Sequence, residues 1–176
     1  MYILSQVIGT IAVTTLIIGF QQKTRKGIIL FNALSTILYT IGYVMLRAYD
    51  GAAVQILTAV VTIVAHNRFK GFVANHTFKV AFVLELTVVL AGILSYQNIF
   101  SICLILGALA QTGSFWLTSE RLIRQISFWC SPFWIVYNIA TRAYGPACGS
   151  TFIMISIGVA IFRYDIIHLL KREKSQ

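Results

Sequence analysis

The sequence predicts an all-α integral membrane protein with seven transmembrane helices, arranged as two parallel three-helix repeats joined by a linker helix (3+1+3). Of its 176 residues, 58% are hydrophobic and only 11% are charged, whereas a soluble domain carries about 25% charged residues. The apolar residues form continuous runs of roughly 17–22 residues, close to the length of about 20 that crosses a bilayer as a helix. Membrane barrel strands would instead alternate in short segments.

Seven spans follow from the apolar runs, each separated from the next by a short polar or basic segment. The first span has no basic n-region and no obvious small-residue cleavage site, so we expect it to be retained rather than removed as a signal peptide. The third and sixth spans are short. The expected spans are 2–20, 27–46, 51–66, 80–96, 99–117, 126–141 and 147–162.

The basic residues predict the orientation. With seven spans, twelve of the fourteen lysines and arginines fall on the side that holds the first, third and fifth loops and the C-terminal tail. Only Arg47 and Arg142 fall on the other side. Cytoplasmic loops carry the excess of Lys and Arg, so we expect the N-terminus outside and the C-terminus in the cytoplasm. The net charge of +9 then reflects topology and lipid headgroup contacts rather than nucleic acid binding.

An internal repeat is indicated by two short turns that match at an offset of 95 residues. Both turns separate long apolar runs, and the identical positions cluster there and near the end of the following run. Spans one to three and five to seven then have the same orientation, with span four as the linker, so the repeats are related by an axis along the membrane normal. The matching pairs are Arg47/Arg142, Ala48/Ala143, Tyr49/Tyr144, Ala52/Ala147, Val64/Val159, Ala65/Ala160 and Arg68/Arg163.

The repeat predicts four segments of the chain. Residues 1–70 form the first triple-helix repeat, and residues 71–97 form a loop and the linker helix. Residues 98–165 form the second triple-helix repeat, and residues 166–176 form a basic cytoplasmic tail.

Four local motifs carry a resemblance to a known family. They are the basic segment 23–26 (KTRK), the turn 46–52 (LRAYDGA), the segment 134–138 (WIVYN) and the exit 163–165 (RYD). In these motifs the chain resembles the bacterial inner membrane protein YgjV family and, more distantly, the SWEET and PQ-loop transporters. The resemblance runs over most of the chain and implies the 3+1+3 fold and a place in the bacterial cytoplasmic membrane.

The chain also departs from the family pattern. The family turn carries a glycine where Arg47 stands, only Pro132 and Pro146 are present, and no Pro-Gln pair occurs. The resemblance therefore supports the fold more than it supports sugar transport, and it implies no particular substrate.

Five residues inside the spans are candidates for a substrate site, because polar groups in a bilayer cost free energy unless they are paired. An amide side chain can bind a solute from its donor and its acceptor end, and aromatic faces can form the walls of a pocket. Tyr39 and Trp134 are equivalent in the repeat and lie in the middle of their spans, so their rings could enclose a flat or sugar-like solute. The alternatives are hydrogen bonds between helices and aromatic core packing. The candidates are Asn32, Tyr39, Gln55, Trp134 and Asn138.

Two further residues have candidate roles in a transport cycle. Glu85 lies six residues after Lys79, about 9 Å deep at 1.5 Å per residue, and is a candidate for proton coupling. It could instead be a neutral acid bonded to a neighbouring helix, or it could reach the inner surface. Pro132 interrupts the sixth span, where a proline removes a backbone hydrogen bond, so it is a candidate hinge or a fixed bend.

The function expected from these features is that of a small-solute transporter or facilitator with a midplane site between the two repeats. The alternative is a membrane scaffold or receptor of the same fold that moves nothing. An enzyme is not expected, because no convergent catalytic set, metal-ligand spacing or cofactor motif occurs. The expected partners are the lipid bilayer and an unknown small molecule, with no nucleic acid, and a homo-oligomer is compatible with the sequence. The three cysteines (103, 130 and 148) are expected to act as small hydrophobes.

Overall fold

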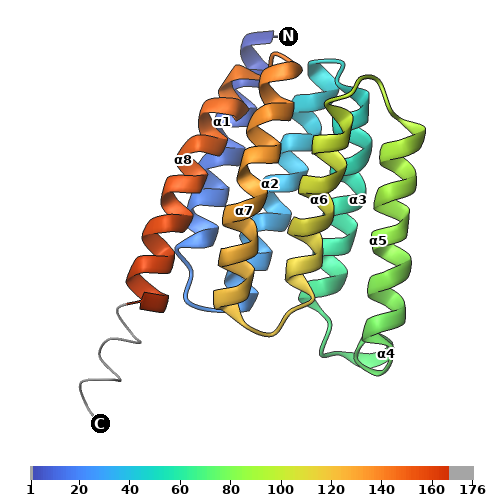
Figure 1. Ribbon diagram of the computed structural model, residues 1–176, viewed down its shortest axis with the longest axis vertical. Helices are drawn as coiled ribbons and strands as arrows, with labels where there is room; N and C mark the ends of the chain where they lie inside the picture. Colours follow the sequence, from blue (N-terminus) through green and yellow to red (C-terminus); the bar gives the residue numbers. More distant parts are fainter. Residues whose placement is uncertain (1, 167–176) are drawn as a thin grey trace.

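The computed structural model describes residues 2–166, which form helices joined by short turns and contain no strand (Figure 1). The predicted all-helical fold is confirmed. The predicted basic tail lies outside the described residues from position 167 onward. The helices are α1 (Tyr2–Phe20), α2 (Arg25–Met45), α3 (Tyr49–His66), α4 (Gly71–Asn75), α5 (Thr77–Leu94), α6 (Ser101–Phe115), α7 (Glu120–Ala140) and α8 (Tyr144–Ala160), with a π-helical turn η1 (Ile161–Ile166) after α8.

Five helical segments are long and apolar enough to cross a membrane by length and composition. They correspond to α1, α2, α3, α5 and α8 extended into η1. Helix α6 is apolar but has only 15 residues, which is about 22 Å at 1.5 Å per residue. Helix α7 has 21 residues, but its first turns (ERLIR) carry three charged side chains. The short helix α4 was not predicted from the sequence.

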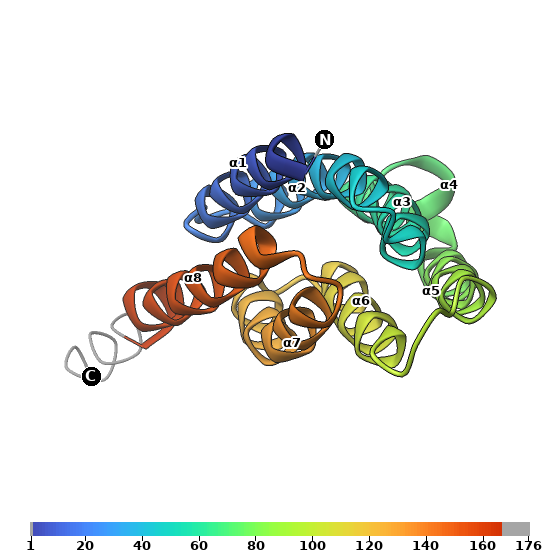
Figure 2. The same ribbon diagram turned by 90° about the horizontal axis from the view of Figure 1, so that it is seen from above.

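The long helices form two rows, which are clear when the molecule is viewed from above (Figure 2). In the first row α2 packs between α1 and α3, and in the second α7 packs between α6 and α8. The rows meet where α1 packs against α8 and where α3 packs against α6. Helix α5 packs against α3 and α6 at one edge of the two rows, and only Val88 and Gly92 of α5 are buried.

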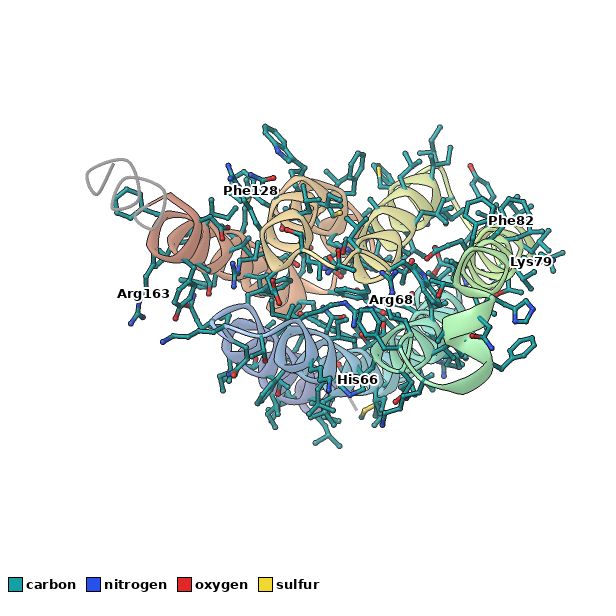
Figure 3. The ribbon with its side chains drawn as sticks, turned by 90° about the horizontal axis from the view of Figure 1, so that it is seen from below. His66, Arg68, Lys79, Phe82, Phe128 and Arg163 are labelled. Atoms are coloured by element: carbon teal, nitrogen blue, oxygen red, sulfur yellow. The ribbon has the colours of Figure 1, made fainter. Side chains whose placement is uncertain are left out.

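The two ends of the molecule differ in charge. We call the end with the α2–α3 and α7–α8 turns the upper end, and the end with the α1–α2 and α6–α7 turns the lower end (Figure 1). Among the described residues, Arg47 and Arg142 are the basic residues in the upper turns. In the view of the lower end, Arg163 and Lys79 lie at opposite edges and Arg68 lies toward the centre (Figure 3).

The two upper turns share an unusual backbone conformation. Arg47 has a φ of 59° and Arg142 a φ of 57°, and among the described residues they are the non-glycine residues with positive φ. This left-handed region favours glycine because a Cβ atom crowds the backbone there. A glycine at this position would adopt the same conformation without that crowding.

Helix α2 shows how the sequence directs one face to the lipid and the other to the interior. Its exposed side carries Leu34, Ile37, Ile41 and Val44, each 45–50% exposed and three or four residues apart. That spacing places them on one helical face. The opposite face carries the buried polar and aromatic residues Asn32, Ser35, Thr36, Tyr39 and Tyr43. An apolar outer face and a polar inner face suit a helix surrounded by lipid on one side.

Candidate functional site

An internal cavity of about 50 Å³ lies between the two rows. Six helices contribute to its lining, namely α1, α2 and α3 from the first row and α6, α7 and α8 from the second. A volume of this size holds a few water molecules. All five candidate residues line it: Asn32, Tyr39, Gln55, Trp134 and Asn138. The structure thus brings together residues that lie up to about a hundred positions apart in the chain, although their role in binding stays a prediction.

The cavity is lined by several amide and hydroxyl side chains but by no charged side chain among the described residues, and most of its surface is apolar. Hydroxyl groups that the sequence analysis did not single out complete it, including Ser35, Thr36, Tyr43, Thr58 and Ser131. The sequence contains a pattern that could have predicted some of these residues. Polar residues recur on α2 at a helical spacing from position 32 to position 43, and such a face inside an apolar span must turn away from lipid.

Asn138 connects the two rows near the upper part of the cavity. The Tyr43 hydroxyl donates to Asn138 Oδ1 at 2.5 Å, and Asn138 Nδ2 donates to Ser150 Oγ at 3.2 Å. Each end of the Asn138 amide therefore has one partner in this conformation. A solute can bind Asn138 through the second N–H of Nδ2 or the second lone pair of Oδ1, or it can replace one of these hydrogen bonds.

Two lining residues retain free hydrogen-bonding capacity. The Gln55 side chain forms no hydrogen bond with the described residues, and the buried Thr58 Oγ1 has no partner among them. Both belong to α3 and stand one turn apart. They offer an amide and a hydroxyl to water or to a polar solute in the cavity.

The two candidate aromatic residues pack against different neighbours, and their role in enclosing a solute stays a prediction. Tyr39 stacks on Tyr43 with ring centroids 6.1 Å apart and an interplanar angle of 21°. Tyr43 also packs edge-on against Tyr137 at 5.9 Å. Tyr39 and Trp134 both line the cavity, but no direct contact between their rings occurs among the described residues. Trp134 instead packs beside Gly107 of α6, where an added Cβ would lie 3.3 Å from Trp134 Nε1.

Hydrogen bonds between the rows close the upper end. Asp50, at the start of α3, is fully buried and accepts hydrogen bonds from Ser101 Oγ and from the Tyr137 hydroxyl, each at 2.8 Å. Across the molecule, the backbone N–H of Gly145 donates to Gln6 Oε1 at 2.8 Å. The sequence analysis treated Asp50 as part of a surface turn, because a charged residue at the end of an apolar run is usually interfacial.

A buried arginine connects the rows at the lower end. Arg25, only 5% exposed, donates through Nε to the Leu117 carbonyl at 2.8 Å and through Nη2 to the carbonyls of Ala65 (2.9 Å) and Phe115. Its backbone N–H donates to Glu120 Oε1 at 3.2 Å. Arg25 thus joins the start of α2 to the ends of α3 and α6, and it too was missed because basic residues near a span end are usually exposed.

A second arginine strengthens the lower end. Arg124 of α7 forms an ion pair with Asp165 at 2.9 Å and donates to the carbonyl of Gln22 at 3.2 Å. Gln21 Nε2 donates to Ser156 Oγ at 2.8 Å. Hydrogen bonds therefore cross from one row to the other at both ends of the molecule.

Glu85 and Pro132 lie outside the cavity lining. Glu85 of α5 accepts hydrogen bonds from Thr112 Oγ1 at 2.7 Å and from Trp116 Nε1 at 3.2 Å. Pro132 lies inside α7, which continues on both sides of it, and its side chain is exposed. Proton coupling by Glu85 and hinge motion at Pro132 stay predictions.

Apolar outer faces, five helices able to cross a bilayer and a polar interior define a multipass helical membrane protein. Residues 3–166 match the family model Imp-YgjV, described as bacterial inner membrane protein. The chain belongs to this family, which places it in the bacterial inner membrane. No curated protein and no solved structure matches the chain.

Proposed function

We propose that this protein is a transporter or facilitator for a small, uncharged polar solute, and that the cavity between the two rows is its binding site. In this proposal α1–α3 and α6–α8 are two parallel repeats, α5 is the linker helix and all seven long helices cross the membrane. The observation that carries the proposal is a cavity between the rows that is lined by amide and hydroxyl groups and by no charged side chain among the described residues, with hydrogen bonds between the rows at both ends of the molecule.

The contacts between the rows support the repeat. Helix α1 is equivalent to α6, and helix α3 is equivalent to α8. Helix α1 packs against α8, and their equivalents α6 and α3 pack against each other in the same way. Gln6 and Ser101 are equivalent at the offset of 95, as are Asp50 and Gly145. The Gln6–Gly145 and Ser101–Asp50 hydrogen bonds thus join equivalent positions in the two halves, with the direction of donation reversed.

The helix starts support the repeat as well. Thr24 caps α2 by accepting from the Gly27 N–H, and Ser119 caps α7 by accepting from the Leu122 N–H. These capping residues are also 95 positions apart. The pair of left-handed arginines in the upper turns belongs to the same pattern.

The charge distribution supports the orientation. The upper end, with two arginines, would face the periplasmic side, and the lower end would face the cytoplasm. Helix α6 packs against α3, α5 and α7. Because these helices surround it, α6 can be shorter than a helix that faces lipid. The charged first turns of α7 lie at the lower end, where they reach the membrane surface.

The cavity suggests the class of solute and how it moves. A lining of amides and hydroxyls without charges favours a neutral molecule with hydroxyl or amide groups, because an ion would lack a counter-charge. Gln55 and Thr58 offer free groups, and Asn32, Tyr39, Trp134 and Asn138 complete the site. The cavity has a volume of only about 50 Å³, so a larger solute enters when one row rocks against the other, as in alternating access.

A thermal-shift screen of the purified protein tests the site. The panel comprises sugars, nucleosides, amino acids and vitamins, and a true ligand raises the unfolding temperature with concentration, equivalent to about 2.7 kcal/mol at a hundred times its Kd. We expect Asn138→Ala and Trp134→Ala to lose that shift. Ile139→Ala, which changes a neighbouring side chain that is 54% exposed, should retain it. An equal shift in all three variants would show that the solute does not bind in the cavity. A solute that binds but is not transported in a separate flux measurement would favour a receptor.

A further inference from the structure

Two arginines lie beside one aromatic ring at the lower end of the first row. The Cζ atom of Arg25, at the start of α2, lies 5.4 Å from the centroid of the Phe69 ring, and the Cζ atom of Arg68 lies 5.1 Å from the same centroid. The two positive charges repel each other. A cation–π contact with a neutral ring stabilises a guanidinium group but supplies no counter-charge.

No carboxylate of the described residues forms an ion pair with either arginine. Glu120 is the acidic side chain that interacts with Arg25, but its Oε1 atom accepts from the Arg25 backbone N–H rather than from the guanidinium group. The Arg68 side chain forms no hydrogen bond with the described residues. Lys26 and Lys70 add two more positive charges from exposed positions nearby. Positive charge therefore exceeds negative charge at this place.

Buried nitrogen atoms without an acceptor occur in the same place. Arg25 is only 5% exposed, and its Nε and Nη2 atoms donate to carbonyls, whereas its Nη1 atom has no partner among the described residues. Arg68 Nε and His66 Nδ1 are likewise buried without a partner among them. His66 lies close enough to Arg25 to interact with it electrostatically. Because a buried donor without an acceptor costs free energy, these side chains suit an acceptor with several oxygen atoms.

The second half of the chain contains a similar cluster that includes its own counter-charge. The Cζ atoms of Arg124 and Arg163 lie 5.1 Å and 5.3 Å from the centroid of the Tyr164 ring. Arg124 forms its ion pair with Asp165 at 2.9 Å. Three pairs of positions in the two clusters match at the offset of 95 residues: Arg68/Arg163, Phe69/Tyr164 and Lys70/Asp165. The first half therefore has a lysine where the second half has the carboxylate.

We propose that Arg25, His66 and Arg68 bind a phosphate group, which supplies the negative charge that Asp165 supplies in the second half. A phosphate group has several acceptor oxygens and matches the planar guanidinium group, so it accepts from both arginines at once. The histidine donates to it from Nδ1 in the tautomer that carries the proton there.

The position of this site indicates two sources for the phosphate group. The spans 25–45 and 49–66 begin and end at the site, which places it at the membrane surface, where the phosphates of anionic phospholipids lie. A soluble phosphate compound carries the same group. None of the three binding residues lines the cavity between the rows, so the proposal does not depend on transport.

Thermal unfolding of the full-length protein in a nonionic detergent tests the site. The probes are phosphatidylglycerol, phosphatidylcholine and inorganic phosphate, and the dependence of the unfolding temperature on concentration gives an apparent Kd for each. We expect the Kd of phosphatidylglycerol to be lower than that of phosphatidylcholine by about tenfold or more, because the choline cation offsets the phosphate charge next to the arginines. Native mass spectrometry of the same samples should show one retained phosphatidylglycerol.

Arg68→Gln is the main variant, because the Arg68 side chain forms no hydrogen bond with the described residues and its loss leaves the carbonyl contacts of Arg25 in place. It should weaken phosphatidylglycerol binding by about tenfold or more, since it removes hydrogen bonds to a charged group. Arg68→Lys, which keeps the charge but not the planar fork, should have an intermediate effect.

Arg163→Gln is the matched control. It removes the same charge from an exposed arginine at the edge of the lower end, whereas Arg68 lies toward the centre (Figure 3). It should change the Kd of phosphatidylglycerol by less than about twofold, because a distant exposed charge is screened.

Inorganic phosphate distinguishes the two sources. Stabilisation by inorganic phosphate that is lost in Arg68→Gln would identify a site for phosphate groups in general. Stabilisation by phosphatidylglycerol but not by inorganic phosphate would identify a site for the lipid headgroup.

Two results would overturn the proposal. The first is equal binding of the two lipids by the parent protein together with no effect of inorganic phosphate. This comparison needs no variant, so it decides even where a substitution impairs folding. The second is an equal weakening in Arg68→Gln and Arg163→Gln, which would show only a general attraction to the basic surface. Either result would leave the transport proposal intact.

Discussion

Replacement of Arg25 by methionine should destabilise the protein, because it removes the donor that three carbonyls share at the lower end. The Ala65 carbonyl also accepts from a backbone N–H, whereas the carbonyls of Phe115 and Leu117 accept no other hydrogen bond from the described residues. The Phe115 carbonyl ends α6 and the Leu117 carbonyl lies two residues beyond it, where no helical N–H is available to them. A buried acceptor left without a donor costs about 1–3 kcal/mol, so two of them cost about 2–6 kcal/mol.

Water from the lower end replaces part of the lost hydrogen bonding, so we expect the lower part of that range, about 2–4 kcal/mol. For a chain of this size each kcal/mol changes the unfolding temperature by about 2–4 °C. The assay is thermal unfolding of the purified protein in detergent, followed by intrinsic fluorescence. The matched control is Lys26→Met, which removes a charge from an exposed neighbour on the same helix turn. If Arg25→Met unfolds within about 2 °C of Lys26→Met, the role given to Arg25 is wrong.

Four further substitutions test the packing, one upper turn and a hydrogen bond between the rows. Gly149→Ala should cost about 1–3 kcal/mol of unfolding free energy, since the new Cβ would lie 2.0 Å from Val13 Cγ2. Gly113→Ala, which meets nothing within 4 Å, should be neutral or stabilising by up to about 1 kcal/mol, and equal effects would contradict the close contact of α1 and α8. Arg47→Gly should raise the unfolding temperature slightly, because glycine adopts the positive φ without a steric cost; a clear fall would refute this. Tyr43→Phe should cost about 0.6–1.7 kcal/mol in a denaturant titration, the range for hydrogen bonds between membrane helices, and no loss would show that the bond to α7 adds nothing.

The sequence located the helices well where apolar runs end in polar segments. Helix α1 has the predicted bounds, because the segment after Phe20 is polar and basic. Helix α7 starts six residues earlier than predicted, since Ser119 caps it and its charged first turns remain helical beyond the apolar run. Helix α2 likewise starts at Arg25, directly after its cap Thr24. Apolar composition alone therefore underestimates the length of helices whose ends reach water.

The candidate site was predictable to the extent that polar residues in apolar helices must turn inward. Asn32, Gln55 and Asn138 meet in one cavity for that reason. Asp50 and Arg25 were not predictable, because a charged residue at the end of a span is normally solvated. Their burial depends on the packing of the opposite row, which a single span does not reveal.

Solute counterflow in proteoliposomes tests the central claim most directly. The purified protein is reconstituted and loaded with a solute that stabilises it in the thermal-shift screen, and uptake of the same labelled solute is followed. We expect uptake above that of protein-free liposomes, nearly abolished in Asn138→Ala and Trp134→Ala and retained in Ile139→Ala. Binding of the solute without flux, or full flux in the two cavity variants, would contradict transport through the cavity between the rows.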